Sequence, residues 1–160
     1  MQKTDLLFGI VSKVPSEGGR HFFLADFDDI SEKTILRRIG RILFDRHRFG
    51  VTYLIKSGRG WHVASFSVKL TLPYYARILE EMKADSEYIR WVKKVRYGVL
   101  RVSRRSSHGE VPFVYKVLVP PWKSKDDLYR DFYINLLSFE DKVETIRRVR
   151  VVEQKELEFI

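Results

Sequence analysis

The fold is decided by a predicted β-hairpin over residues 51–70, which read VTYLIKSGRGWHVASFSVKL. The part up to Lys56 is apolar and rich in β-branched and aromatic side chains, which favour strands. The segment Ser57-Gly58-Arg59-Gly60 predicts a turn, because glycine adopts the backbone angles that tight turns require. The residues from Trp61 to Leu70 then predict a returning strand, so the hairpin is antiparallel.

Strand and helix patterns alternate on both sides of this hairpin. Residues 6–14 and 21–27 predict a second hairpin with a five-residue loop. Ser31 is placed to cap a helix over residues 32–48, whose isoleucine and leucine side chains form one apolar stripe. After the central hairpin, the patterns predict helices that begin near Thr71 and Ser86, strands over 99–103 and 113–119, and a helix over about 125–137.

The resulting element order, ββαββααββα, predicts an α+β fold in which helices pack on one face of a mostly antiparallel sheet. An apolar fraction of 44% is sufficient for a buried core. No internal repeat and no linker long enough to separate domains interrupts the chain, so a single domain over residues 1–160 is expected.

The composition of the chain limits the classes of function. Lysine and arginine number 30 against 21 aspartate and glutamate, and the net charge of +9 indicates a polyanionic partner unless the protein is simply basic. The absence of cysteine excludes a disulfide scaffold, thiolate zinc sites and cysteine catalysis. No apolar run approaches the ~20 residues of a membrane span, and the first residues lack a signal-peptide pattern, so a cytoplasmic protein without a membrane partner is expected. One asparagine, two glutamines and 32% charged residues are typical of a thermophilic source.

A pair of acidic residues follows the apolar strand predicted over residues 21–27. Asp26 and Asp28 are two positions apart, so on an extended chain they point to the same face. Two like charges this close disfavour each other unless a cation lies between them, and carboxylates suit Mg²⁺ or Mn²⁺. Asp29 points to the other face and is interpreted as a helix-capping or solvent-exposed residue. The alternative for Asp26 and Asp28 is that they only decorate the turn before a helix, where the helix dipole favours negative charge.

The glycine turn of the central hairpin carries the features of an anion site. Its backbone N–H groups can form an anion-binding concavity, to which Lys56 and Arg59 add positive charge. Ser57 can donate a hydroxyl hydrogen bond, and His62 can donate a ring proton to a phosphate oxygen. The alternative is a plain hairpin in which His62 packs beside Trp61.

These two motifs, in this order and separated by one helix, resemble the catalytic palm of the archaeo-eukaryotic primase superfamily over residues about 20–118. The family's first motif, Asp-x-Asp or Asp-x-Glu after a strand, is similar to Asp26-Phe27-Asp28. Its second motif, a serine and a histidine in a glycine-containing hairpin, is similar to Ser57-Gly58-Arg59-Gly60-Trp61-His62, in the form closest to the plasmid- and virus-associated branch. The resemblance implies an RRM-like palm over residues 5–120 with residues 122–160 as a C-terminal appendage, and an archaeal, viral or plasmid source.

The resemblance also implies a metal-dependent nucleotidyltransferase of the primase–polymerase type. Asp26 and Asp28 would be the catalytic residues that bind Mg²⁺ or Mn²⁺. Ser57 and His62 would bind the triphosphate of an incoming nucleoside triphosphate, with Arg59 as a helper. Such chemistry depends chiefly on positioning and charge neutralisation, for which these residue types are suited. A palm this small is expected to act on single-stranded or primed nucleic acid with a replication partner, such as a helicase or a larger subunit.

The family's third motif, an aspartate on a later strand, has no counterpart just before the strand predicted at Val99. Residues 92–97 contain no carboxylate, and the nearest acids are Asp85 and Glu87 upstream and Glu110 downstream. Either one of these acids substitutes, or the site holds metal poorly, or the protein is a catalytically reduced, primase-like protein that binds nucleic acid without polymerising it.

Basic residues surround this position and would favour phosphate over a metal ion. Arg101 is therefore a further candidate for nucleotide binding. The candidates for nucleic-acid contact are Lys93, Lys94, Arg96, Arg104, Arg105 and His108, for which a solvated basic face is the alternative. The candidates for base stacking are Trp61, Tyr97 and Trp122, for which core packing is the alternative.

A hypothesis from another enzyme class competes with this interpretation. Residues 24–28 also resemble the nucleophile motif of haloacid-dehalogenase phosphatases, and residues 54–57 resemble their second motif. That fold requires a parallel sheet around Asp26, so the strand directions distinguish the two hypotheses.

Overall fold

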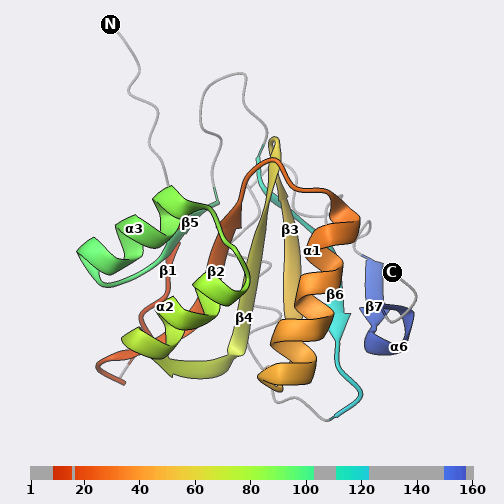
Figure 1. Cartoon of the computed structure of the whole chain (residues 1–160), viewed down its shortest axis with the longest axis horizontal. Coiled ribbons are helices and arrows are strands. Elements are labelled where there is room, and N and C mark those ends of the chain that lie inside the picture. The colour runs from red at the N-terminus through yellow and green to blue at the C-terminus, as the bar shows by residue number, and fades with distance from the viewer. Residues whose placement is uncertain (1–8, 16, 103–110, 123–149, 158–160) are drawn as a thin grey trace, which may run out of the picture.

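The structure is a computed structural model that describes residues 9–15, 17–102, 111–122 and 150–157. The predicted α+β fold is confirmed: helices pack against a mostly antiparallel sheet (Figure 1). The main sheet has five strands in the order β2-β4-β3-β6-β7, and among them only β6 and β7 pair in parallel. Its strands are β2 (Arg20–Phe27), β3 (Thr52–Ser57), β4 (Gly60–Thr71), β6 (Phe113–Val119) and β7 (Arg150–Glu153).

The central hairpin forms as predicted, with β3 and β4 joined by a turn at Gly58 and Arg59. Gly58 has a φ of 54°, a left-handed conformation that glycine adopts without steric cost. Strand β4 also pairs antiparallel with β2, so the hairpin brings His62 opposite Asp26. The sheet therefore joins the two sequence motifs directly.

The first strand differs from its prediction as one arm of a hairpin with β2. Strand β1 (Gly9–Val11) instead pairs antiparallel with β5 (Val99–Arg101) in a separate two-stranded sheet. Only the single bridge between Lys13 and His21 remains of the predicted hairpin. The reason is the short apolar run of β1, whose backbone groups find a partner that is distant in sequence.

The helices begin close to their predicted positions. Helix α1 (Glu32–Arg38) is capped by Ser31, whose Oγ accepts a hydrogen bond of 3.2 Å from the Thr34 amide. The predicted single helix continues as the π-helix η1 (Ile39–Arg46), a wider turn that the apolar spacing did not indicate. The remaining helices are α2 (Leu72–Glu81), α3 (Ser86–Val95) and the short α6 (Gln154–Leu157).

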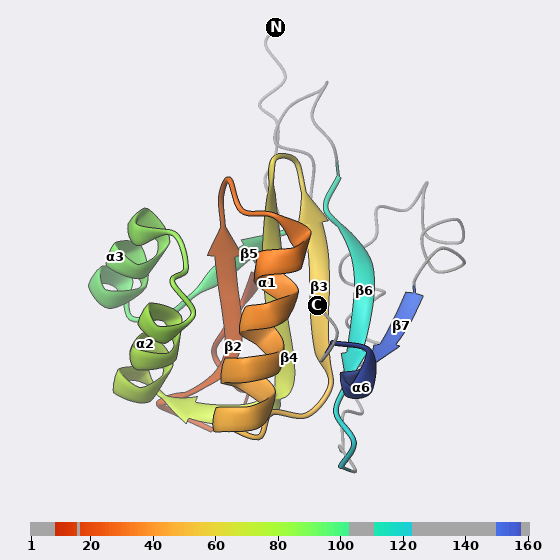
Figure 2. The ribbon, with the colours of Figure 1, turned by 45° about the vertical axis from the view of Figure 1, so that its right-hand side comes forward.

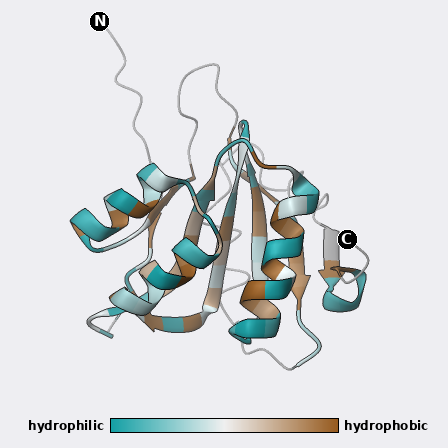
Figure 3. Ribbon diagram, viewed as in Figure 1, coloured by the Kyte–Doolittle hydropathy of each residue, from teal (hydrophilic) through white to brown (hydrophobic). Residues whose placement is uncertain are grey.

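Helices α1 and α2 lie on the same side of the main sheet in two views (Figures 1 and 2). Phe23 of β2 points to this side, because its ring packs at 5.9 Å from Tyr75 of α2 and at 5.4 Å from Phe49. The hydropathy colouring shows apolar residues concentrated along the strands and alternating with polar residues along the helices (Figure 3). Since alternate strand residues face opposite ways, Asp26 lies on the other face of the sheet from Phe23.

The C-terminal strand joins the edge of the main sheet. Strand β7 pairs with β6, and the side chains of Val152 and Leu157 belong to the buried core. The helix predicted over about 125–137 lies outside the described residues. Among the described residues, no helix combines the length and the apolar character needed to cross a membrane.

Candidate metal and nucleotide site

Three carboxylates converge where β2 ends. Oxygen atoms of Asp26, Asp28 and Asp85 lie within 4.8 Å of one another. Asp26 is on β2, Asp28 follows that strand, and Asp85 is the residue before α3. The backbone N–H of Asp85 donates a 2.9 Å hydrogen bond to the carbonyl of Asp26, which fixes the start of α3 against β2. Three hard oxygen donors at this spacing suit Mg²⁺ or Mn²⁺.

The acidic cluster (Asp26, Asp28 and Asp85) is electrostatically unfavourable without a cation. The pKa of Asp28 is raised above its ordinary value of 3.8, first by partial desolvation of its carboxyl group, although the residue as a whole is exposed. The negative charges of Asp26, Asp85 and Asp29 raise this pKa further, and His62 opposes them. A divalent cation would remove the repulsion.

His62 lies beside the acidic cluster because β4 pairs with β2. Its Nε2 is 3.4 Å from Oδ1 of Asp26, and its side chain is only 7% exposed. Among the described residues, its buried Nδ1 has no hydrogen-bond partner. A buried polar nitrogen is normally paired, so this unpaired atom sets His62 apart from an ordinary core histidine.

Gly60 allows the turn of the hairpin to approach the acidic cluster closely. A Cβ atom at this position would lie 2.2 Å from the carbonyl oxygen of Phe27 and 3.1 Å from Oδ1 of Asp28. Only glycine fits so near to another backbone segment. The second predicted motif therefore touches the first through a contact that requires this residue.

The other predicted nucleotide ligands lie nearby on the same sheet face or at the turn. Ile55 pairs with His62, so Ser57, two positions further, shares the face of His62. Arg101 reaches this face from β5, and its Nη2 donates a 3.4 Å hydrogen bond to Oγ of Ser57. Arg59 is exposed at the turn, whereas Lys56 turns to the opposite face, where its Nζ lies 4.3 Å from the Trp61 ring centroid.

The predicted nucleic-acid contacts do not gather at the acidic cluster. Lys93 and Lys94 are exposed in the last turn of α3, the opposite end from Asp85, and Lys93 pairs with Glu80. Arg96 follows the helix and lines a separate cavity, described below. The remaining three candidates, Arg104, Arg105 and His108, lie outside the described residues.

Two of the three stacking candidates pack against the protein core. Trp61 is buried, and its Nε1 donates to the carbonyl of Ile30 at 3.1 Å. The Trp122 Nε1 donates to the carbonyl of Phe49 at 3.0 Å, which anchors this half-buried ring. Tyr97 is also half-buried, but it packs against an exposed neighbour, Trp91, that the sequence analysis did not single out.

The third acid of the site was one of several open alternatives in the sequence. Asp85 belongs to the acidic cluster, whereas Glu87 is not part of it and pairs with Arg90 at 3.1 Å. Glu110 lies outside the described residues. The signal for Asp85 was its position directly before a helix, but only the contact between α3 and β2 brings it to Asp26.

Two buried tyrosines support the strand beneath the acidic cluster, and the sequence motifs gave no signal for them. The hydroxyl groups of Tyr75 and Tyr88 both donate to the carbonyl of Leu24. Burial raises the pKa of both phenols well above the ordinary value of 10.0, so each hydroxyl remains a donor at neutral pH. They hold the edge of β2 in place two residues before Asp26.

The phosphatase hypothesis is wrong. Its fold requires parallel strands around Asp26, whereas β2 pairs antiparallel with β4 over Asp26 and His62. Strand β3, which carries the second resembling segment, is also antiparallel to both of its neighbours.

We expect Asp28→Asn to stabilise the metal-free protein slightly at neutral pH. Because the pKa of Asp28 is raised on folding, folding is penalised as the pH rises from the unfolded pKa through the folded pKa, and the penalty is complete at higher pH. The midpoint of thermal unfolding in EDTA at pH 7 should rise by about 1–3 °C, a small effect because solvent screens the group. Below the ordinary pKa of 3.8 the difference should vanish.

Scanning calorimetry at several pH values measures this effect, with Glu87→Gln as the control because it removes a carboxylate outside the acidic cluster. Added Mn²⁺ should stabilise the wild type more than Asp28→Asn. An Asp28→Asn variant less stable than the wild type in EDTA would contradict the repulsion described above.

Comparison of the chain with protein-family models, with curated proteins and with solved structures finds no match.

Proposed function

We propose that this protein is a metal-dependent nucleotidyltransferase of the primase–polymerase type. It would bind a nucleoside triphosphate and single-stranded or primed nucleic acid, and would transfer a nucleotide to a 3′-hydroxyl group with release of pyrophosphate. The observation that carries the proposal is the convergence of Asp26, Asp28 and Asp85 beside His62 at the junction of β2 and β4. This junction joins the two motifs that resemble the primase superfamily.

The residues present fit a divalent cation. Asp26, Asp28 and Asp85 would hold Mg²⁺ or Mn²⁺, because carboxylate oxygens are the ligands that these ions prefer. The raised pKa of Asp28 supports this assignment, since it reports a concentration of negative charge. When bound, such ions activate a hydroxyl nucleophile and neutralise the charge of the leaving pyrophosphate.

The triphosphate would lie on the sheet face that His62 and Ser57 share. The Asp26 carboxylate at 3.4 Å orients the ring of His62 through Nε2. The Nδ1 of this ring is buried and has no hydrogen-bond partner among the described residues, so an entering phosphate oxygen would have to displace the atoms that cover it. Arg101, held beside Ser57, would add the positive charge that phosphate recognition needs, and Arg59 would approach from the exposed turn.

The catalytically reduced alternative depended on the lack of a third carboxylate. Asp85 brings a third carboxylate oxygen within 4.8 Å of those of Asp26 and Asp28, although from the start of a helix rather than from a strand. This position favours the catalytic proposal over the reduced one. A cytoplasmic location and a replication partner, such as a helicase or a larger subunit, belong to the same proposal.

A template-extension assay tests the proposed function. The purified protein, a primed single-stranded template and labelled nucleoside triphosphates should give extended product with Mn²⁺ or Mg²⁺, and none with EDTA. If the protein binds template and triphosphate but gives no product with either ion, the catalytic proposal is wrong and the reduced alternative holds.

A further inference from the structure

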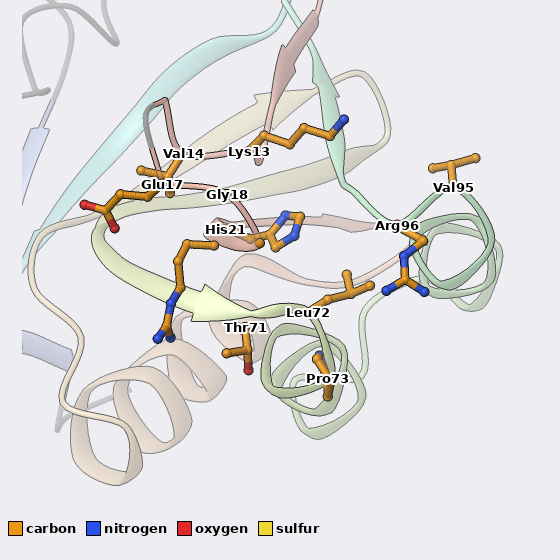
Figure 4. Close-up of a pocket in the computed structure, with 12 residues that line it drawn as sticks. Lys13, Val14, Glu17, Gly18, His21, Thr71, Leu72, Pro73, Val95 and Arg96 are labelled. Carbon is orange, nitrogen blue, oxygen red and sulfur yellow. The ribbon is translucent and has the colours of Figure 1, made fainter.

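A second concave site lies at the other end of β2 from Asp26. It is a cavity of about 690 Å³ between residues 13–14 and 17–21, the start of α2 and the end of α3 (Figure 4). His21 lies between Lys13 and Leu72 in this view, and Arg96 reaches in from the end of α3. Three of the lining residues, Lys13, Arg20 and Arg96, are cationic, so we call this cavity the basic pocket.

The positive charge of the basic pocket is not neutralised within the described part of the chain. Glu17, the one acidic residue among the described residues that line the pocket, forms an ion pair of 2.5 Å with Lys69. No described carboxylate forms an ion pair with Lys13, Arg20 or Arg96. The pocket therefore presents an excess of positive charge to an anion.

The backbone fixes two walls of the basic pocket. Arg96 ends α3 with a left-handed φ of 70°, and its N–H donates to the carbonyl of Val92 at 2.8 Å. On the opposite wall, Thr71 precedes the ten-residue helix α2, and its side chain makes no capping hydrogen bond. Pro73 in the first turn of α2 has no N–H, so the positive charge of the pocket comes from its three cations.

His21 forms a neutral polar wall of the pocket. Its Nδ1 lies 2.8 Å from Oγ of Ser12, which fixes the orientation of the ring. Burial lowers the pKa of His21, and the charge of Lys13 lowers it further. The ring is therefore a neutral hydrogen-bonding group of fixed orientation, and it adds no charge to the pocket.

An aromatic pair adjoins the basic pocket. Trp91 is 39% exposed on α3, and its ring packs edge-to-face against Tyr97 at 5.3 Å. The Nζ of Lys13, which lines the pocket, lies 4.6 Å from the centroid of the Tyr97 ring. A large exposed ring beside unpaired cations is the combination with which proteins bind single-stranded nucleic acid.

We propose that the basic pocket binds a backbone phosphate of a single nucleic-acid strand and that a neighbouring base stacks on Trp91. This inference extends the proposed function and rests on it for the identity of the ligand. The site is separate from the acidic cluster: Asp85 and Arg96 flank the ten residues of α3, a length of about 15 Å. A strand held here would leave the acidic cluster free for the triphosphate.

Binding of a fluorescent twelve-nucleotide oligo(dT) in EDTA tests the pocket without contribution from a metal ion. The variant Lys13→Gln/Arg96→Gln should bind about tenfold more weakly at low salt, because two charge-assisted contacts are lost. The slope of log affinity against log salt should decrease in magnitude by about 0.7, because the pocket neutralises one phosphate. The matched control Lys33→Gln/Arg41→Gln removes the same charge from exposed positions near α1 and should change neither quantity by as much.

Variants of the aromatic residue test the stacking contact. Trp91→Ala should weaken oligo(dT) binding about tenfold, and Trp91→Phe should retain most of the affinity, because it keeps a ring. The expected decreases in both variants, with the control unaffected, would support the proposal. An affinity of Lys13→Gln/Arg96→Gln equal to that of the control would overturn it.

The same experiment separates a strand from a free anion. If Trp91→Ala binds oligo(dT) normally while Lys13→Gln/Arg96→Gln weakens oligo(dT) and inorganic pyrophosphate equally, the pocket is a general anion site and the strand assignment is wrong. Because EDTA is present throughout, a negative result here is distinct from failure of the acidic cluster, which is read from Mn²⁺ binding.

Discussion

Replacing Asp26 by asparagine is expected to reduce template extension at least about a hundredfold. Loss of a group that only supports a metal ligand typically costs 10- to 100-fold, so loss of a direct ligand should cost more. Asp26 is also the acid nearest to Nε2 of His62, and its backbone carbonyl anchors Asp85. Asparagine keeps the shape and the hydrogen-bonding oxygen but removes the charge, so the fold should survive.

Rates of nucleotide incorporation over a range of Mn²⁺ concentrations measure this effect, and circular dichroism checks the fold. Asp85→Asn should give a loss of the same order, because its carboxylate completes the acidic cluster. The matched control is Glu87→Gln, which should retain the wild-type rate. Glu87 lies on α3, two residues after Asp85, and is outside the acidic cluster. If Asp26→Asn and Glu87→Gln are equally active, the acidic cluster is not the catalytic site.

Gly60→Ala is expected to destabilise the protein by about 2–3 kcal/mol, within the range of overpacked core substitutions. The added methyl group would lie 2.2 Å from the carbonyl oxygen of Phe27, which is backbone and cannot rotate away. The chain must therefore separate β4 from the end of β2. The same displacement would move Asp28, whose Oδ1 is 3.1 Å from the added atom, so metal binding should weaken as well.

Urea denaturation of three glycine variants isolates the steric contribution. Gly58→Ala should cost about 1 kcal/mol, because the residue has a φ of 54° but no atom would contact its Cβ. Gly18→Ala should stay within about 0.5 kcal/mol of the wild type, because it meets neither a contact nor a strained backbone angle. A Gly60→Ala variant no less stable than Gly58→Ala would contradict the close approach of the two motifs.

The local patterns of the sequence were sufficient for most elements. The turn between β3 and β4 depends on the nearby glycines Gly58 and Gly60, and α2 begins where Pro73 favours a first helical turn. Strand β6 has the bounds predicted from its apolar run, Phe113–Val119. In each case the decisive interactions lie within a few residues of one another along the chain.

The elements that sequence patterns did not predict depend on contacts between distant segments. Strand β1 pairs with β5, about ninety positions along the chain, and no local signal distinguishes this partner from β2. The apolar residues in this part of the sequence recur at α-helical spacing, so periodicity predicted an α-helix where the structure has π-helical turns from Ile39 to Arg46.

The candidate site likewise combines residues that local patterns predict with residues that depend on distant contacts. The common direction of Asp26 and Asp28 follows from the two-residue period of a strand, and the structure places both acids in the acidic cluster. The contribution of Asp85 depends on how α3 meets β2, which spacing along the chain does not encode. Trp61 is the opposite case. Its position beside a charged turn made it a stacking candidate, but the ring is buried, and its Nε1 donates to the carbonyl of Ile30 between β2 and α1.

The central claim is that the acidic cluster and His62 together bind a divalent cation and a triphosphate. Crystals of the protein grown with Mn²⁺ and a non-hydrolysable nucleoside triphosphate allow the metal to be located by its anomalous scattering. We predict an anomalous peak among the carboxylates of Asp26, Asp28 and Asp85, with the triphosphate extending toward His62. Saturating Mn²⁺ without a peak at these carboxylates, or triphosphate density elsewhere on the molecule, would contradict it.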